Sequence, residues 1–242
     1  AASTFMRGVD YYQIPTTLLA MVDSAIGGKT GINIAEGKNL VGAIYQPKAV
    51  FVDPTLLKSL PKEEVISGLG EIIKYGAIKD KEFFNEISNS LENIESFPFE
   101  NIIYRACEIK ADIVTQDERE GSIRRILNFG HTIGHALEAH FGYGKLRHGE
   151  AVSYGMICAG WISNQLGHLS NNDYQRLKKT IEKLPLPMLN NFDQNKILPF
   201  VKNDKKTVSG KLNFVILDTL GSATTTKDVS DELILNSLKV IQ

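Results

Sequence analysis

The sequence has only two cysteines, Cys107 and Cys158, and they are too far apart to form a CxxC motif. A disulfide scaffold is therefore excluded, and we interpret both residues as reduced thiols of a cytoplasmic protein. The sequence contains no run of about eighteen apolar residues, so no membrane span is predicted. No basic segment followed by an apolar one opens the chain, so no secretory signal is predicted either.

An excess of charge of one sign is equally absent. The 27 Lys and Arg residues nearly balance the 28 Asp and Glu residues, and the formal net charge is −1. Since the sequence has no basic stripe, nucleic acid is not expected as a partner. The 43% hydrophobic and 23% charged residues are typical of a globular protein, and 242 residues suffice to bury a substantial core.

The hydrophobic pattern changes after Asp53 and Pro54. Before this point, residues 1–7 are typical of the end of a helix, and residues 9–14 and 49–52 are typical of short buried strands. Beyond it, most segments have the helical period. The elements predicted there are helices over residues 62–79, 82–94, 100–115, 123–141, 149–166 and 172–182, a hairpin of strands 211–217 and 222–226, and a helix from residue 231.

Four of the five histidines lie in the segment 128–150, at positions His131, His135, His140 and His148. Read as one helix over residues 123–141, the segment puts a cation, an amide and two imidazoles on one face, from Arg124, Asn128, His131 and His135. A Gly-Tyr-Gly sequence ends that helix, and a second helix begins near His148. Histidines on two neighbouring helices favour a divalent metal site.

The spacing leaves open which histidines coordinate the metal. His131 and His135 are four residues apart, as in zinc helices of the H-E-x-x-H type, but Thr132 stands where that motif requires glutamate. A lone histidine on a half-apolar helix is more often hydrogen-bonded than metal-bound, and the clustering of four histidines is what favours the metal interpretation.

Two loops rich in glycine and lysine precede the helices. In the first, VDSAIGGKTGIN, three glycines surround Lys29 and Thr30, and exposed amides with an ammonium suit an anion. The second loop lies at residues 36–39, and neither loop has the spacing of a Walker A motif. Thr16 and Thr17 stand at a predicted strand-to-helix junction, where a hydroxyl caps a helix or binds a polar ligand.

The predicted helix over residues 62–79 contains two unfavourable glycines, Gly68 and Gly70. Because glycine weakens a helix, we predict that another segment approaches the backbone closely there. Glu71 and Lys74 share a face within an otherwise apolar run, which predicts that at least one of them is buried against a partner. The alternative is an ion pair on the surface.

The sequences VDSAIGGKTGIN, GKNLVGAIYQP, SGLGEIIKYG and LNFGHTIGHALEA, with the later HGEAV, together resemble the pattern of the dehydroquinate synthase family over essentially the whole chain. The resemblance implies a Rossmann-like α/β domain that binds NAD, followed by a helical domain that carries the metal and most substrate contacts. The implied class is α+β, with residues 1–60 as the remnant of the first domain and residues 61–242 as the helical domain. The family's glycine-rich nucleotide turn would precede Ala1, so we expect this chain alone to be inactive.

The metal ligands implied by the resemblance are one carboxylate and two imidazoles, from Glu71, His131 and His148. Such a set fits catalytic zinc, which keeps positions open for substrate oxygens, and cobalt is an equal alternative. His135 would then belong to the substrate site. The other residues that match substrate-site positions are Arg7, Asp23, Lys29, Asn39, Lys74, Lys110, Glu120, Arg124 and Asn128.

Further positions follow from the same resemblance. Arg7 matches an arginine that reaches the active site of a neighbouring subunit, which implies a homodimer. Either Lys205 or Lys206 in the basic turn also meets the substrate. The residues that match the retained part of the NAD site are Thr16, Thr17, Lys29, Lys38, Leu56, Leu57, Lys58 and Ser59.

The implied activity is that of a phosphorus-oxygen lyase in the shikimate pathway of aromatic amino acid biosynthesis. It converts 3-deoxy-arabino-heptulosonate 7-phosphate to 3-dehydroquinate and phosphate through transient oxidation by NAD, elimination, reduction and an intramolecular aldol step. An anionic sugar phosphate explains the number of cations in the motifs. The alternatives are another sugar-phosphate cyclase, a polyol dehydrogenase of the same superfamily, and a non-catalytic helical module with a structural metal. The last ranks low because structural zinc usually needs four Cys or His ligands.

Overall fold

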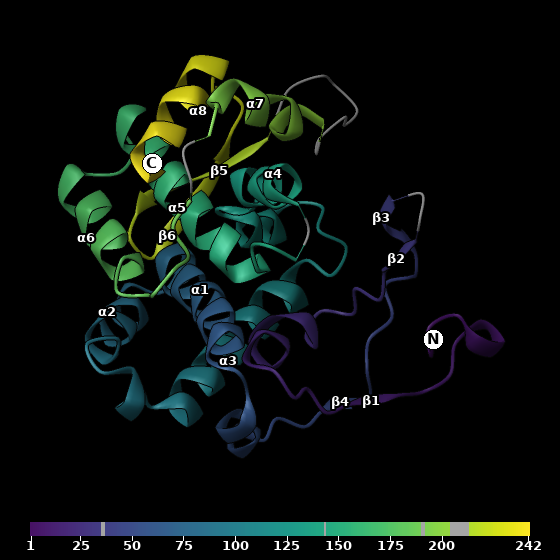
Figure 1. The fold of residues 1–242 in the computed structure, drawn as a ribbon. Coiled ribbons are helices and arrows are strands. Elements are labelled where there is room, and N and C mark those ends of the chain that lie inside the picture. The colour runs from purple at the N-terminus through teal and green to yellow at the C-terminus, as the bar shows by residue number, and fades with distance from the viewer. Residues whose placement is uncertain (35–36, 143, 190–191, 204–212) are drawn as a thin grey trace.

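The elements before the first α-helix are short and form an N-terminal arm, from which residues 20–24 pack into the core of the helical body made by the later elements, as Figure 1 shows. The computed structural model describes residues 1–34, 37–142, 144–189, 192–203 and 213–242. Glycines and prolines recur in the arm and keep its elements short. These elements are η1 (Phe5–Arg7), β1 (Tyr12–Gln13), η2 (Ala20–Ser24), β2 (Ile32–Ile34), β3 (Gly37–Val41), β4 (Ala49–Val50) and η3 (Pro54–Ser59).

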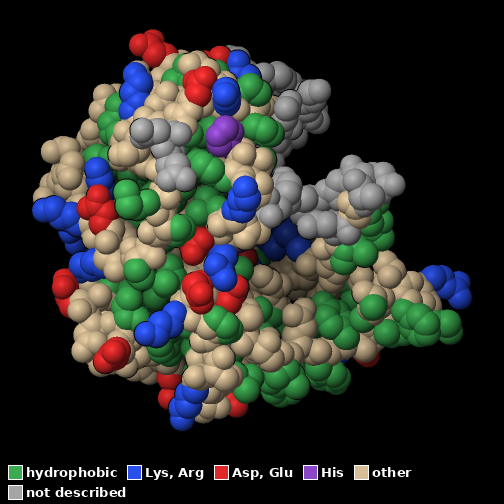
Figure 2. Space-filling model, viewed as in Figure 1, with side chains coloured by type: hydrophobic (Ala, Val, Ile, Leu, Met, Phe, Trp, Pro, Cys, Tyr) green, Lys and Arg blue, Asp and Glu red, His purple; other side chains and the backbone are tan. Residues whose placement is uncertain are grey.

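Strands β1 and β4 of the arm pair in parallel, with Tyr12 opposite Ala49. A parallel pair requires a long crossover, and here the crossover contains η2 and the hairpin of β2 and β3. The side chains of Tyr12, Ile14 and Phe51 are exposed along this pair. Figure 2 shows hydrophobic side chains gathered over the arm, and the surface is hollowed between the arm and the helical body.

The helical body consists of eight α-helices and one hairpin in the described residues. The helices are α1 (Lys62–Lys79), α2 (Lys81–Ser90), α3 (Phe99–Gln116), α4 (His131–Phe141), α5 (His148–Gln165), α6 (Asn171–Ile181), α7 (Gln194–Asn203) and α8 (Asp231–Leu238). Short 3-10 helices lie at η4 (Ile94–Ser96), η5 (Ile123–Asn128) and η6 (Lys239–Ile241), and the hairpin pairs β5 (Phe214–Thr219) with β6 (Ser222–Thr226). None of the described helices has the length and apolar character that crossing a bilayer requires.

Helices α1 and α5 form the centre of the body. In α1 every residue from Ser67 to Ile78 is buried, and most of α5 is buried as well. A helix that is buried on all sides needs apolar residues around its whole circumference, which both sequences provide. Helix α5 packs against α1, α4 and α6, and also against β5 and α8. The prediction of a mainly helical α+β fold is confirmed, whereas the boundary at residue 60 stays a prediction.

The predicted helix over residues 123–141 is wrong, because the chain breaks in its middle. Residues Ile123–Asn128 form the 3-10 helix η5, Gly130 adopts φ 79°, and α4 begins only at His131. A Cβ atom at Gly130 would lie 2.6 Å from Cγ of Met156, so the glycine lets α5 approach at this turn. Arg124 and Asn128 therefore do not share a helix face with the histidines.

The strands predicted to be buried at residues 9–14 and 49–52 are only the short β1 and β4, and their exposed side chains show that the predicted burial is wrong. Other differences concern the ends of the predicted elements. Residues 1–7 contain only the 3-10 turn η1, because Met6 and Arg7 have positive φ values of 50° and 69°. Residues 37–39 of the second predicted loop instead belong to β3, which pairs with β2, and residue 36 lies outside the described residues. Helix α7 was not predicted. The C-terminal hairpin and the helix beginning at Asp231 are confirmed.

Candidate metal centre

Helices α1 and α5 touch through their backbones, which brings Glu71 and His148 together. A Cβ atom on Gly149 would lie 1.7 Å from the carbonyl oxygen of Ser67, and one on Gly70 would lie 2.5 Å from the carbonyl oxygen of Gly149. The Gly149 N–H also donates a hydrogen bond to Oγ of Ser67 at 3.0 Å. Only glycine permits this contact, so the prediction of a close approach at Gly70 is confirmed.

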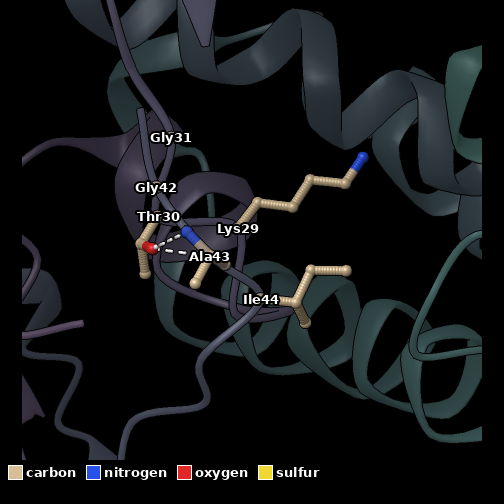
Figure 3. Close-up of a pocket in the computed structure, with 6 residues that line it drawn as sticks. All are labelled: Lys29, Thr30, Gly31, Gly42, Ala43 and Ile44. Atoms are coloured by element: carbon tan, nitrogen blue, oxygen red, sulfur yellow. Dashed lines mark hydrogen bonds between the residues drawn. The ribbon is translucent and has the colours of Figure 1, made fainter. Parts of the chain in front are cut away.

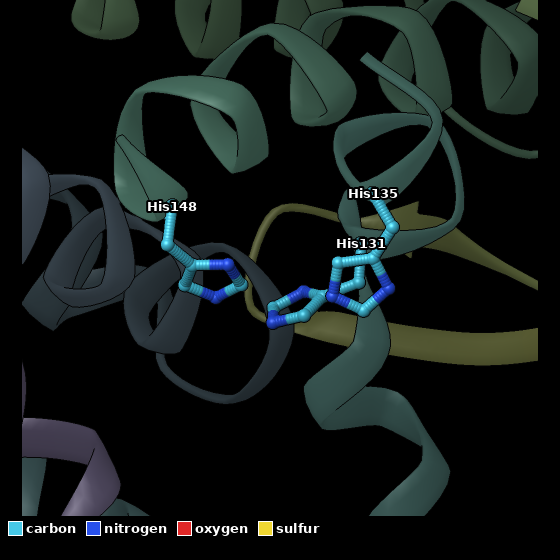
Figure 4. Close-up of side chains that lie close together, drawn as sticks. All are labelled: His131, His135 and His148. Carbon is cyan, nitrogen blue, oxygen red and sulfur yellow. The ribbon is translucent and has the colours of Figure 1, made fainter. Parts of the chain in front are cut away.

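Helices α4 and α5 are equally close, and this contact places His131 and His135 beside the start of α5. A Cβ atom on Gly155 would lie 1.9 Å from the carbonyl oxygen of Gly130. The three imidazoles of His131, His135 and His148 point toward one another, as Figure 4 shows. One ring nitrogen from each lies within 4.8 Å of the other two.

The carboxylate of Glu71 faces two of these imidazoles. Its Oε1 atom lies 3.5 Å from Nε2 of His131 and 3.4 Å from Nε2 of His148. In a tetrahedral zinc site with bonds of 2.0 to 2.1 Å, two ligand atoms are separated by about 3.3 Å. The two distances from Oε1 of Glu71 to the imidazole nitrogens therefore fit a shared divalent ion. The nitrogen of His135 lies within 4.8 Å of the other two imidazoles, a limit that exceeds the separation in a tetrahedral site.

A buried oxygen without a hydrogen bond supports the same conclusion. Glu71 is 0% exposed, and its Oε1 has no hydrogen-bond partner among the residues that the structure describes. Leaving such a group unsatisfied costs free energy, whereas coordination to a metal ion would satisfy it. Among the described residues, the donor set of one carboxylate and two or three imidazoles suits zinc or cobalt.

The charges around Glu71 keep this carboxylate ionised. Burial alone would raise the pKa of Glu71, but the ammonium of Lys74, which forms an ion pair with Oε2, together with His131 and His148 outweighs burial and holds this pKa well below its usual range. Both side chains of the pair are buried, so the prediction of burial is confirmed and the alternative of a surface ion pair is wrong.

The two facing imidazoles differ in their proton affinity. Burial lowers the pKa of His131 to about 3, so this ring is neutral and able to coordinate. Burial acts in the same direction on His148, but the carboxylates of Glu138 and Glu71 outweigh it and raise the pKa of His148 to about 10. The fourth clustered histidine, His140, instead packs its ring against Phe141, Phe192 and Phe200.

A second charged group lies beside the metal centre. Lys110 on α3 donates hydrogen bonds to the carboxylate and the backbone carbonyl of Asp23, the former at 2.6 Å. The hydroxyl of Tyr75 contacts the same carboxylate at 2.8 Å. Burial alone would raise the pKa of Asp23, but the ammonium groups of Lys110 and Lys74 together outweigh burial and lower this pKa to about 2. Asp23 therefore stays ionised with a fixed orientation.

A third group joins the arm to the loop before α4. Glu120 forms an ion pair with Lys29 and accepts a hydrogen bond from Nδ2 of Asn128 at 2.6 Å. Arg124 is buried and donates to the carbonyl oxygen of Gly27 at 2.9 Å. Its Nε atom is also buried and has no hydrogen-bond partner in the described part of the chain. The structure thus brings together residues that the sequence separates widely.

Lys29, which pairs with Glu120, also lines a pocket of about 430 Å³ in the arm, shown in Figure 3. The pocket is lined by Lys29, Thr30, Gly31, Gly42, Ala43 and Ile44. The hydroxyl of Thr30 donates to the carbonyl oxygen of Ala43 at 2.7 Å and accepts from its N–H at 3.1 Å. Thr30 therefore holds the two sides of the pocket together.

Asp117 shapes the loop that carries Glu120. Its carboxylate accepts hydrogen bonds from the N–H groups of Gly121, Ser122 and Arg124, at 2.8, 2.7 and 3.1 Å. These bonds hold Glu120 at φ 58°, a conformation that is unfavourable for a residue other than glycine.

We expect Asp117→Asn to release this loop, because an amide offers one acceptor oxygen in place of two. Amide hydrogen exchange at Ser122 and Arg124 is expected to become roughly tenfold faster, with no change in α1. Hydrogen exchange followed by mass spectrometry measures this change. Unchanged protection at both amides would show that the loop does not depend on Asp117.

Several predicted residues lie outside these three groups. Arg7 is exposed at the end of η1. Oγ1 of Thr17 accepts the N–H of Ala20 at 3.2 Å, which is the capping role, and Thr16 is exposed. In η3, Leu57 is buried in the core and Leu56 packs against it, while Lys58 and Ser59 are exposed. The side chains of Lys38 and Asn39, and all of Lys205 and Lys206, lie outside the described residues.

Two family models match adjacent parts of the chain and together cover most of its length. The model described as 3-dehydroquinate synthase N-terminal matches residues 1–67, and the model described as 3-dehydroquinate synthase C-terminal matches residues 68–207. The chain belongs to the 3-dehydroquinate synthase family. The resemblance predicted from the sequence motifs is therefore confirmed.

Curated relatives of the 3-dehydroquinate synthase family align with the whole chain. The 3-dehydroquinate synthase of Crocosphaera subtropica is 43% identical over 249 residues, which cover 100% of this chain and 68% of the relative. That of Nostoc punctiforme is 45% identical over 246 residues, which cover 99% of this chain and 68% of the relative. The chain thus spans about two thirds of the length of these relatives.

Solved structures of sugar-phosphate cyclases share the fold. The 2-epi-5-epi-valiolone synthase of Streptomyces hygroscopicus, solved with NAD+ and Zn2+ bound, superposes with a TM-score of 0.90 at 27% identity, covering 99% of this chain and 68% of that one. A 2-deoxy-scyllo-inosose synthase complexed with carbaglucose-6-phosphate, NAD+ and Co2+ gives 0.87 at 29% identity, covering 100% and 70%. A glycerol dehydrogenase from Schizosaccharomyces pombe, at 17% identity and a TM-score of 0.63, shares the fold alone.

Two residues that contact the site have no role implied by the sequence motifs of the 3-dehydroquinate synthase family. Tyr75 follows Lys74 directly and fixes Asp23. Glu138 lies seven residues after His131, which is two helical turns and therefore the same face of α4, and this spacing is the signal that could have identified it.

Proposed function

We propose that this protein is a 3-dehydroquinate synthase that converts 3-deoxy-arabino-heptulosonate 7-phosphate to 3-dehydroquinate and phosphate. The observation that carries the proposal is the buried Oε1 of Glu71, which faces two imidazole nitrogens at 3.4 and 3.5 Å in a chain of this family. We also propose that the protein works in the cytoplasm as a homodimer, in which Arg7 reaches the neighbouring subunit.

Glu71, His131 and His148 would hold a divalent metal ion, Zn2+ or Co2+. A metal ion bound there supplies Lewis acidity, and NAD supplies a reversible hydride acceptor. Structural neighbours solved with NAD+ and Zn2+ or Co2+ support both cofactors. His135 lies beside the two imidazoles and completes one wall of the substrate site. The proposed NAD contacts are Thr16, Thr17, Lys29, Lys38, Leu56, Leu57, Lys58 and Ser59.

The cations of the site fit a substrate with a phosphate and a carboxylate. Lys29, Lys74 and Lys110 each form an ion pair with a carboxylate of the protein, and these pairs fix the ammonium groups before any substrate arrives. Preorganised cations stabilise developing negative charge without reorganisation, so the arrangement suits phosphate elimination. In η5, Asn128 is hydrogen-bonded to Glu120, and Arg124 adds a buried positive charge behind the same group. Asn39 is assigned to the substrate site from the family pattern.

The proposal is tested by measuring phosphate release from 3-deoxy-arabino-heptulosonate 7-phosphate with NAD and Zn2+. The assay uses a form of the protein that is as long as its curated relatives, and the 242-residue chain is assayed beside it. We expect one phosphate per dehydroquinate without net consumption of NAD at full length, and no turnover from the 242-residue chain. Absence of phosphate release at full length would refute the activity.

Another sugar-phosphate cyclase activity is the second candidate, because the structural neighbours include such enzymes. Identities of 43 and 45% to 3-dehydroquinate synthases, against 27 and 29% to the other cyclases, favour the first candidate. Assaying glucose 6-phosphate in parallel separates the two, since this sugar phosphate corresponds to the carba-analogue bound in one neighbour.

A further inference from the structure

The imidazole of His148 lies between two carboxylates. Its Nε2 atom faces Oε1 of Glu71 at 3.4 Å, inside the candidate metal centre. On the opposite side of the ring, Nδ1 faces Oε2 of Glu138 at 3.6 Å. Glu138 belongs to α4 and is 8% exposed, so its charge is screened little by water.

We propose that Glu138 is a positioning residue that fixes the orientation and tautomer of His148 for metal binding. The inference rests on the proposed metal centre and assigns one more residue to it. A carboxylate oxygen that faces Nδ1 favours the tautomer with hydrogen on that nitrogen. When a metal ion displaces the other proton of the ring, the lone pair that becomes free is on Nε2, the atom directed at Glu71.

The other candidate ligand, His131, has the same arrangement with a different acceptor. Its Nδ1 atom lies 3.1 Å from the backbone carbonyl oxygen of Phe129, and its Nε2 atom faces Glu71. The carbonyl group is fixed by the turn at Gly130. Both imidazoles therefore present Nε2 to the same carboxylate while an oxygen stands behind Nδ1. Acceptors of this kind raise the basicity of metal-binding histidines and hold their rings in place.

Helix packing explains why a side chain must supply the acceptor behind His148. His148 is the first residue of α5, and its ring extends toward α4 across the contact between these helices. Glu138 lies two turns after His131 on α4 and reaches the ring from that helix. The carboxylate also adds a negative charge near the cation, which a backbone carbonyl does not.

The test measures metal affinity of the purified chain, so it does not depend on catalytic activity. Metal-free protein is titrated with Zn2+ alone in competition with a chromophoric chelator. Glu138→Gln and Glu138→Ala are expected to weaken Zn2+ binding roughly 10-fold to 100-fold, as loss of such outer partners does in other metal sites. Glu138→Asp, which keeps the charge, is expected to bind more tightly than Glu138→Gln.

Glu150→Gln is the matched control. Glu150 is also a buried carboxylate near His148, and its Oε2 accepts the backbone N–H of Arg147 at 2.8 Å to cap α5. In this variant the glutamine oxygen can still accept the Arg147 N–H, so the buried negative charge is lost while the cap is kept, and we expect its Zn2+ affinity to stay within about threefold of wild type. A purely structural role of Glu138 predicts that both positions behave alike. The visible spectrum of the Co2+-loaded variants gives a second readout, because it responds to the geometry of the ligands.

The outcomes separate this inference from the proposed function. If wild type binds Zn2+ and both Glu138→Gln and Glu138→Ala bind it equally tightly, Glu138 has no positioning role and the ligand assignment is untouched. If Glu150→Gln weakens binding as much as Glu138→Gln, the effect is structural and the inference is refuted. If wild type itself binds no Zn2+, the metal centre is refuted, and the role of Glu138 with it.

Discussion

Replacing His148 by Ala is expected to abolish Zn2+ binding by the purified chain and turnover by the full-length protein. The loss of a ligand should weaken binding by more than the roughly 100-fold that loss of an outer partner causes. Metal content after dialysis, measured by atomic absorption, checks this expectation. His168→Ala is the control, because His168 pairs with Asp218 at the surface and lies outside the cluster. A full equivalent of zinc retained by His148→Ala would contradict the ligand assignment.

Glu71→Gln is expected to have the same effect on the metal and a further effect on stability. The ammonium of Lys74 is buried and forms an ion pair with Glu71, so the variant leaves a buried charge without its partner. Removing one member of a buried pair costs about 3 to 5 kcal/mol. His148→Ala leaves this ion pair intact, and comparing the two variants separates loss of the metal from loss of the fold.

Gly149→Ala is expected to disrupt the contact between α1 and α5, and with it the metal centre. The added Cβ would lie 1.7 Å from the carbonyl oxygen of Ser67, and no side-chain rotation relieves a clash with backbone. The cost should exceed the roughly 3 kcal/mol at the upper end of ordinary overpacking. For a chain of this size, we expect the melting temperature to fall by roughly 6 to 12 °C or more.

Thermal unfolding and zinc content are measured together for this variant. Gly121→Ala is the control, since its nearest neighbour would be Oδ1 of Asp117 at an ordinary 3.7 Å. A wild-type melting temperature for Gly149→Ala would show that the two helices tolerate separation. Loss of zinc with little loss of stability would show that the contact acts mainly on the position of His148.

The sequence predicted those parts of the fold in which local pattern and tertiary packing agree. The helix over residues 62–79 has the predicted bounds, because its apolar residues and its glycines both fit a buried helix. The predicted burial of Glu71 and Lys74 follows from the apolar residues around them. The family motifs identified the candidate ligands, and the structure brings Glu71, His131 and His148 close together.

The wrong predictions concern contacts between segments that are distant in the sequence, about which hydrophobic periodicity gives no information. The pattern over residues 123–141 is helical throughout, but α5 presses against Gly130 and forces a left-handed turn there. The pairing of Lys29 with Glu120 joins a loop of the arm to a loop of the body. Helical period also gives no information about the acceptor behind a histidine ring, so Glu138 could be recognised only once α4 and α5 were placed side by side.

The candidate ligands come from α1, α4 and α5, with α2 and α3 lying between the first ligand and the second along the chain. Each of these three helices carries only one of the candidate ligands Glu71, His131 and His148. All three ligands can therefore meet one ion only after the three helices have docked, which makes complete coordination a late event in folding. The colour of bound Co2+ should consequently develop after helical circular dichroism has recovered during refolding, and the delay would time the docking of α1 onto α5.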